Sequence, residues 1–249
     1  MDLLQAVSPN FWVAFGSFVF CSVIGVPLSN FVSSNFSAYK QASKEKQQEW
    51  DTRFISTIHA STVAVLSTIV LIVDQESYGN PILGQFWGME AVASINQGYF
   101  VADTCLMLFY LTKSYNGYWF DIFHHIANSI VVISCIKNNV LLHLVMVRYL
   151  SEWSTPFLNM RWFMLKSKVV EGTIYVANGI LLLAFFFLSR IAIMPYMYYN
   201  FFAYHDDVKK TGYLQYLILC GVAMDLLNIF WFIKIVQSTL KFMRKPKSS

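Results

Sequence analysis

The sequence predicts an all-α membrane protein with seven transmembrane helices, and two observations support this prediction. The first is composition: of 249 residues, 56% are hydrophobic, 17% aromatic and 13% charged, whereas a soluble domain carries about 25% charged residues. The second is spacing, because the apolar residues fall in blocks of about twenty, the length that crosses a hydrocarbon core. Disordered chains, fibrous repeats and ordinary cytosolic enzymes are excluded.

The seven apolar blocks follow one another with short polar loops between them. The fourth is the shortest, and Lys137-Asn138-Asn139 joins it to the fifth as a tight helical hairpin. The apolar segment Ile82–Ala93 contains two glycines, so it either extends the third block or lies along the membrane interface. The predicted spans are Phe11–Val32, Phe54–Val73, Ser94–Thr112, Phe120–Ile136, Asn139–Leu158, Val170–Ser189 and Tyr213–Val236.

Basic residues predict the orientation of the bundle. Lysines and arginines concentrate in the first, third and fifth loops and in the C-terminal tail, and are sparse in the loops between them. Cytoplasmic loops carry such an excess, so we expect a lumenal N-terminus and a cytosolic C-terminus. The net charge of +4 then reflects membrane orientation, and we expect no nucleic-acid partner.

Short motifs add expectations about processing and location. The start Met1-Asp2-Leu3-Leu4 lacks the basic residues of a cleaved signal, so the first span is expected to remain as an anchor. Asn35-Phe36-Ser37 matches a glycosylation acceptor, but a cytosolic position would leave it bare. Lys245 and Lys247 resemble a dilysine signal for retrieval to the endoplasmic reticulum; the alternative is a basic tail on anionic lipid. The four cysteines have no paired spacing and are interpreted as buried apolar residues.

Several ionisable residues lie inside the predicted spans, where they are costly and usually functional. Their positions place most of them in the cytosolic half; His59, for example, is five residues past Phe54, about 8 Å deep at 1.5 Å per residue. They are His59, Asp103, Asp121, His124, His125, Arg148, Glu152 and Asp225. We expect them to meet in one cavity that opens to the cytosol.

Helical spacing suggests how these residues pair. Asp121 and His125 are four residues apart, as are Arg148 and Glu152, so each pair can share one helix face. His124 and His125 point about 100° apart, so one is expected to face the cavity and the other a neighbouring helix. His143 and His205 are expected at the lumenal interface.

Two interpretations of this cluster remain open. In the first, His124 or His125 acts as a general base or nucleophile with Asp121 orienting it, and His59, Asp103 or Asn128 holds a carbonyl or oxyanion. In the second, the polar residues only hold helices together; for Asp225 with Asn228 the choice is open. We expect no metal site, since His59, His124 and His125 lack a zinc-binding spacing. Walker, Rossmann and GxSxG patterns are absent from the sequence.

The motifs resemble the TLC domain, the family of ceramide synthases and translocating-chain-associated proteins. The resemblance rests on Asp121-Ile122-Phe123-His124-His125-Ile126-Ala127-Asn128, on His59 upstream, and on the stretch from Glu152 to Trp162. Ser154–Trp162 is most similar to the small TLC domain-containing proteins of the fourth subfamily. The expected organisation is an N-terminal anchor helix and cytosolic loop (residues 1–49), a TLC domain (50–241) and a basic tail (242–249).

The resemblance implies six of the seven helices in a ring around a lipid-accessible cavity, often in the endoplasmic reticulum. In ceramide synthases the double histidine lies at the active site, where an acyl group passes from acyl-CoA to a sphingoid amine. This sequence departs from that pattern in having Asn128 in place of a threonine, and Ser151 and Glu152 in place of an acidic run.

Two functional hypotheses follow from the residues and the resemblance. The first is a protein of lipid metabolism or homeostasis that holds a fatty-acyl or sphingolipid-like ligand, with cargo reception as a variant. The second is a ceramide-synthase-like acyltransferase with acyl-CoA as donor substrate and no bound cofactor. The candidate catalytic residues are His124, His125 and Asp121; the candidate cavity residues are His59, Asp103, Asn128, Arg148, Glu152 and Asn159. The expected partners are membrane lipid, acyl-CoA or sphingolipid, with a homodimer as a candidate assembly.

Overall fold

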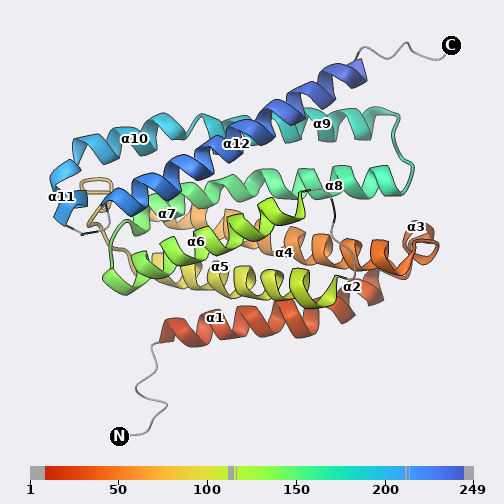
Figure 1. Cartoon of the computed structure of the whole chain (residues 1–249), viewed down its shortest axis with the longest axis horizontal. Coiled ribbons are helices and arrows are strands. Elements are labelled where there is room, and N and C mark those ends of the chain that lie inside the picture. Colours follow the sequence, from red (N-terminus) through yellow and green to blue (C-terminus); the bar gives the residue numbers. More distant parts are fainter. Residues whose placement is uncertain (1–8, 112–114, 116, 211, 213, 244–249) are drawn as a thin grey trace, which may run out of the picture.

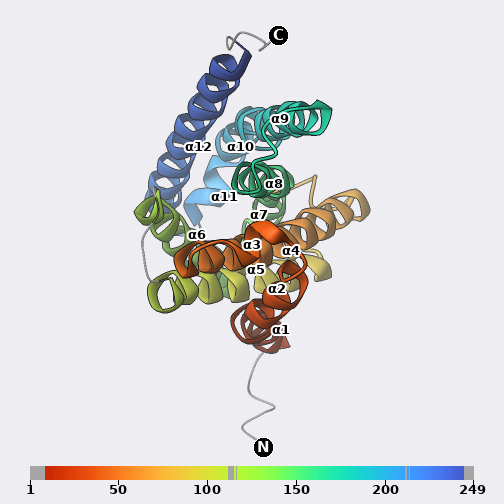
Figure 2. The ribbon, with the colours of Figure 1, turned by 90° about the vertical axis from the view of Figure 1, so that its right-hand side faces the viewer.

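The computed structural model of the chain describes residues 9–111, 115, 117–210, 212 and 214–243. Throughout these residues the regular secondary structure is helical (Figures 1 and 2). The α-helices, in chain order, are α1 (Pro9–Val19), α2 (Gly25–Ser33), α3 (Ser37–Lys40), α4 (Lys44–Val73), α5 (Trp87–Cys105), α6 (Tyr118–Asn138), α7 (Leu142–Tyr149), α8 (Thr155–Lys166), α9 (Thr173–Phe186), α10 (Met194–Ala203), α11 (His205–Lys210) and α12 (Leu214–Met243).

Short segments of other helix types join several of these helices end to end. Three are π-helical, at Phe20–Ile24, Leu106–Tyr110 and Phe187–Ile191, and one is a 3₁₀ segment at Leu150–Ser154. Interruptions of this kind inside a long helix often mark functional sites. Two of them carry charged side chains, which the site description below locates.

In the described part of the chain, five helical stretches are long and apolar enough to cross a membrane. They are Asn10–Ser33, Lys44–Val73, Tyr118–Asn138, Thr173–Ala203 and Leu219–Lys241. They overlap the first, second, fourth, sixth and seventh predicted spans. The third and fifth predicted spans are also helical, in α5 and in α7–α8, and they lie alongside the other helices (Figure 1).

The structure also corrects the sequence-based boundaries. The sixth span was predicted to end at Ser189, but the helical stretch continues to Ala203, because Arg190 is buried and hydrogen-bonded inside the bundle. The helix of the third predicted span, α5, begins at Trp87 and not at Ser94. The later part of the segment Ile82–Ala93 therefore extends this helix. The hairpin at Lys137–Asn139 is tight, with Asn139 in the left-handed region at φ 54°.

The first helix packs closely against α5. A side chain at Gly98 of α5 would place its Cβ 2.1 Å from the carbonyl oxygen of Ala14, so only glycine permits this approach. Ser17 Oγ donates a hydrogen bond to the carbonyl of Ile95, 2.7 Å away. The N-terminal helix therefore contacts the rest of the bundle along its length.

The remaining helices contact one another in a continuous order. Helix α5 contacts α4 and α6, α6 contacts α12, α12 contacts α9, α9 contacts α8, and α8 contacts α4. Helix α7 packs against α4 and α5, and its residues Leu142–Val147 are all buried. The main hydrophobic core lies around α7 and includes Val63, Met89 and Met146.

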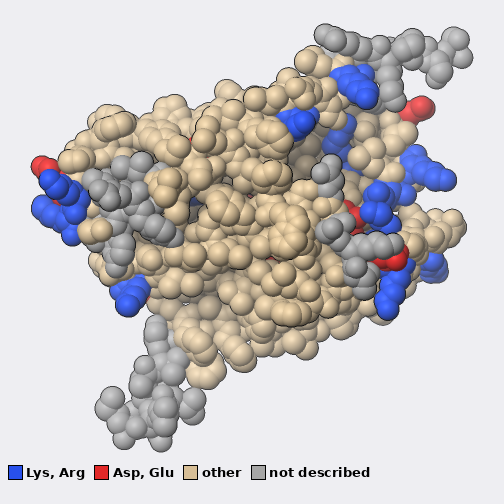
Figure 3. All heavy atoms as spheres, viewed as in Figure 1, with Lys and Arg blue, Asp and Glu red and all other residues tan. Residues whose placement is uncertain are grey.

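On the face shown in Figure 3, most lysine, arginine, aspartate and glutamate side chains lie toward the two ends of the molecule, and few lie between them. One end holds α3, the start of α4 and the ends of α8 and α12, and the other holds α11 and the end of α6 (Figure 1). At the α11 end, hydrogen bonds from Lys210 and Asn80 lower the pKa of the Asp207 carboxyl. A middle surface with few charged side chains between two charged ends is typical of a membrane-embedded bundle.

Candidate functional site

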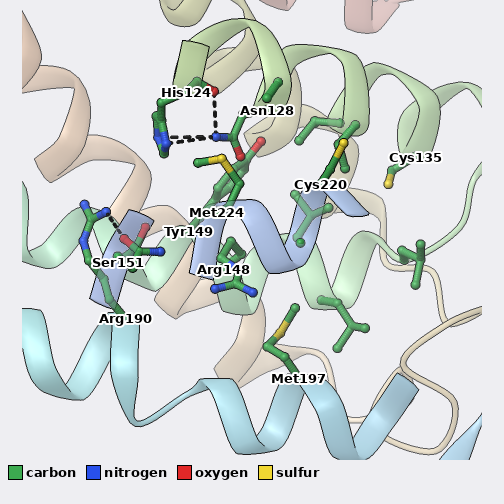
Figure 4. A pocket seen from close by; sticks show the side chains of 18 of the residues that line it. His124, Asn128, Cys135, Arg148, Tyr149, Ser151, Arg190, Met197, Cys220 and Met224 are labelled. Atoms are coloured by element: carbon green, nitrogen blue, oxygen red, sulfur yellow. Dashed lines mark hydrogen bonds between the residues drawn. The ribbon is translucent and has the colours of Figure 1, made fainter. Parts of the chain in front are cut away.

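A pocket of about 110 Å³ lies between α6, α7, α10 and α12 (Figure 4). Its residues differ in character along its length. Apolar and sulfur-containing side chains line one part, namely Val131, Val132, Cys135, Leu141, Leu144, Val145, Met197, Phe201, Cys220 and Met224. Polar side chains line the other part: His124, Asn128, Arg148, Ser151, Glu152, Arg190 and Asn228. The cavity thus offers hydrogen-bonding groups on one part of its wall and apolar surface on the other.

Helical interruptions position two of the charged side chains. Glu152 lies in the 3₁₀ segment Leu150–Ser154, and Arg190 lies in the π-helical segment Phe187–Ile191. Each segment changes the angular spacing of its residues relative to an α-helix. Pro156, in the first turn of α8, lacks an N–H at a position where helices have no internal acceptor. The interruption before Pro156 thus ends α7 and turns Glu152 toward the pocket.

The two adjacent histidines have different surroundings. His124 lines the pocket, and Asn128 Nδ2 lies 3.3 Å from its Nε2 while donating to the His124 carbonyl at 2.9 Å. His125 is buried toward α5, with its Nδ1 3.5 Å from Asp103 Oδ2 and its ring stacked on Phe100. The structure therefore directs His124 into the pocket and His125 against a neighbouring helix.

The expected pairing of Asp121 with His125 is wrong. Asp121 accepts a hydrogen bond from the Tyr115 hydroxyl at 2.7 Å, and His125 is paired with Asp103. Helical side chains tilt toward the N-terminus, which brings Asp121, in the first turn of α6, toward Tyr115. Asp121 is absent from the pocket lining.

The expected pairing of Arg148 with Glu152 is also wrong. Arg148 Nη1 lies 2.6 Å from Asp225 Oδ1 on α12, and Asp225 Oδ2 accepts a hydrogen bond from Tyr198. Glu152 Oε2 instead accepts from Thr155. The physical reason is the 3₁₀ segment: at about three residues per turn, Glu152 no longer lies above Arg148 as it would in an α-helix.

Arg190 is the pocket residue that the sequence analysis missed. Its Nε donates to Ser154 Oγ at 2.9 Å, its Nη1 donates to Asn228 Oδ1 at 3.1 Å, and its guanidinium packs over the Phe186 ring. The available signal was a single arginine inside a long apolar run, which is costly in a membrane. The predicted sixth span ended at Ser189, so Arg190 was not counted among the ionisable residues inside the spans.

A second polar cluster lies between α4 and α5, outside the pocket lining. His59 Nε2 is 3.0 Å from Asn96 Oδ1, and the His59 ring stacks on Tyr99 at 3.7 Å. Asp103 and His125 belong to the same region. Asn159, on α8, binds α4 through the Arg53 carbonyl and the Ser56 and Thr57 hydroxyls. These side chains hold helices together in this structure.

The structure thus divides the predicted site residues into two groups. The pocket contains His124, Asn128, Arg148 and Glu152. The contacts between helices contain His59, Asp103, His125 and Asn159, and Asp121 bonds to Tyr115 in the segment before α6. The expectation that all of them share one cavity is therefore met only for the first group.

The two remaining histidines lie apart from the pocket. His143 is fully buried, 3.1 Å from the Tyr196 hydroxyl and 3.5 Å from Asp74, so it is a core residue and not an interfacial one. His205 is exposed at the start of α11. Within the described ranges, no three histidine, cysteine or acidic side chains come together as a candidate metal site.

Comparison with known proteins places this helical bundle among membrane proteins with the TLC domain. The family model for that domain matches residues 49–237, and the chain therefore belongs to the TLC domain family. The chain is similar to TLC domain-containing protein 4 of Homo sapiens (31% identity, covering 85% of this chain and 83% of the relative). It is also similar to TLC domain-containing protein 4-B of Danio rerio (33% identity, 92% and 89%). TLC domain-containing protein 4 A of Dictyostelium discoideum is 23% identical, with coverage of 84% and 81%.

Proposed function

We propose that this TLC-domain protein holds one membrane lipid, of fatty-acyl or sphingolipid-like type, in the pocket and acts in lipid homeostasis. The observation that carries the proposal is the division of the pocket into a polar part, with His124, Glu152 and Arg190, and an apolar part. A lipid head group would meet hydrogen-bonding groups in the first part. The methylene groups next to the head group would fill the second, since a cavity of about 110 Å³ is too small for a whole acyl chain.

The proposal includes seven membrane crossings and a ring of six helices. Helix α5 with its π-helical end and the α7–α8 stretch are each long enough to cross a hydrocarbon core at 1.5 Å per residue, and their polar residues face other helices. The ring is supported by the contacts between successive helices, which run from α4 through α5, α6, α12, α9 and α8 and back to α4. Helix α1 lies outside it, against α5.

We place the basic end of the bundle in the cytosol and the protein in the endoplasmic reticulum. The first, third and fifth loops meet at that end, as the positive-inside rule requires. Glu152 lies in the segment between α7 and α8, and Arg190 lies in the segment between α9 and α10. The junction of α7 and α8 lies nearer to the basic end than the start of α7 does (Figure 1). The pocket would then open toward the cytosolic side. The dilysine pair, Lys245 and Lys247, lies outside the described residues and rests on sequence alone.

The alternative function is a His124-dependent acyltransferase. His124 would accept the proton of an amine as the amine attacks the thioester carbonyl of acyl-CoA. The acyl group would pass to the amine nitrogen, and CoA would leave as the thiol after taking up that proton. A general base of this kind is normally oriented by a carboxylate. Among the described ion pairs, the histidines beside carboxylates are His125, His143 and His205. His124 has Asn128 instead, which favours binding over catalysis.

Native mass spectrometry of the purified protein tests the proposal. We expect a copurifying lipid in the wild type and its loss in Ala127→Trp, which places an indole in the pocket. Ala177→Trp, on the exposed side of α9, is the matched control and should retain the lipid. Equal lipid content in the two variants would overturn the proposal, and acyl transfer from acyl-CoA that is lost in His124→Ala would establish the enzymatic alternative.

A further inference from the structure

A second hollow of about 480 Å³ lies on the outside of the bundle, between α6 and α12. Its lining is entirely apolar: Trp119, Phe120, Phe123, Ala223, Leu226, Leu227 and Phe230. We call this hollow the outer groove. Trp119 is 71% exposed and Leu226 is 61% exposed, so these side chains face the surroundings of the bundle. Both helices are candidate membrane spans, and the surroundings at this height are therefore acyl chains.

The outer groove and the pocket lie on opposite sides of the same helix pair. Phe123 lines the groove while His124 lines the pocket, and Leu227 lines the groove while Asn228 lines the pocket. One layer of side chains from α6 and α12 therefore separates the two hollows. We call this layer the seam.

Aromatic contacts and small residues make up the seam. The rings of Phe120 and Phe230 lie 6.2 Å apart, and those of His124 and Trp231 lie 5.7 Å apart. Ala223 lines the groove and Gly221 lines the pocket, and a Cβ added at Gly221 would meet nothing within 4 Å. These ring contacts involve no ion pair, so changes of side-chain rotamer can separate the rings.

The other side of α12 is held by stronger interactions. Asp225 is paired with Arg148, and Asn228 accepts from Arg190. Toward its C-terminal end, α12 leans away from the rest of the bundle (Figures 1 and 2). Separation of α12 from α6 would therefore leave the charged contacts of the pocket in place.

We propose that the outer groove binds the acyl chain of a membrane lipid and that this chain reaches the pocket sideways, through the seam between α6 and α12. The inference rests on the proposed lipid-binding function and adds the route by which the ligand enters. The groove takes the chain because it is apolar, faces lipid and adjoins the pocket. His124 and Asn228, on the inner side of the seam, are the first polar groups that the head group meets.

The test compares rates with equilibrium occupancy. The protein is placed in phosphatidylcholine nanodiscs, and uptake of a pyrene-labelled fatty acid is followed by stopped-flow fluorescence. Ala223→Trp fills the groove without entering the pocket, so we expect at least tenfold slower uptake and release with unchanged occupancy. Val222→Trp, one residue away and outside both linings, should keep wild-type rates.

A second variant covers the case in which Ala223→Trp does not fold. Phe120→Cys with Phe230→Cys, joined by a short bismaleimide, would hold the seam closed, and the same protein without the reagent is its control. Closure should slow uptake by a similar factor. Wild-type rates in both the tryptophan variant and the joined protein would overturn the proposed route while leaving lipid binding intact. Absence of probe from the wild type at equilibrium would overturn the lipid-binding function, and the route with it.

Discussion

His125 Nδ1 lies 3.5 Å from Asp103 Oδ2, and both side chains are buried between α5 and α6. The pair joins two helices, whereas the preceding residue, His124, lines the pocket. Adjacent histidines on one helix thus have separate tasks. One belongs to the packing of the bundle and the other to the wall of the pocket.

This separation predicts different effects for the two alanine substitutions. His125→Ala removes a buried ring that stacks on Phe100, so it leaves a cavity and should destabilise the bundle by about 2–4 kcal/mol. His124→Ala, at a half-buried ring on the pocket wall, should cost less stability than His125→Ala and reduce lipid retention. Unfolding in SDS measures the first effect and native mass spectrometry the second. The opposite assignment, with His125 alone needed for lipid retention at full stability, would contradict the separation.

The ion pair between Arg148 and Asp225 is expected to couple α7 to α12. Asp225→Leu leaves the partly buried Arg148 guanidinium without its counter-charge, so it should destabilise the bundle by about 1–3 kcal/mol. Removing both in Arg148→Leu with Asp225→Leu should recover much of the loss. A double-mutant cycle in SDS unfolding provides the coupling energy. Additive losses would mean that the 2.6 Å contact contributes nothing to stability.

The fold was largely predictable from the sequence because hydrophobic length is a strong signal. Blocks such as Phe54–Val73 identified helices independently of tertiary contacts. Helix junctions were harder to predict, since the continuation of a helix through Arg190 depends on partners in the 3₁₀ segment and in α12.

The site was predictable in its residue types but not in its pairings. His124, Asn128, Arg148 and Glu152 were identified because polar groups in a membrane are costly. The pairings expected from α-helical spacing failed where the helix is not α-helical, as at Glu152, and where another helix supplies a nearer partner, as Asp103 does for His125.

Gly98 provides a test of the contact between the first helix and α5. Gly98→Ala would place a methyl group 2.1 Å from the Ala14 carbonyl, so α1 must move away, at a cost of about 1–3 kcal/mol. Cys21 is 3% exposed and should become reactive toward a maleimide. Gly16→Ala, at a position with nothing within 4 Å, is the matched control and should leave both stability and labelling unchanged. Equal labelling of Cys21 in the two variants would show that the close approach is not needed.

Topology is the last prediction, and it depends on the distribution of basic residues between the two ends of the bundle. An N-terminal extension of about 20 residues carrying a glycosylation acceptor should receive glycan, because positive-inside orientation places this terminus in the lumen. The same extension at the C-terminus should stay bare, and so should Asn35, whose acceptor follows the end of α2 at Ser33. Asn35 lies close to the end of a helix, so the comparison of the N-terminal with the C-terminal extension is the clearer test. Glycosylation is measured as a shift in gel mobility that endoglycosidase removes. Glycan on the C-terminal extension alone would show that the orientation is the opposite one, with the polar part of the pocket on the lumenal side.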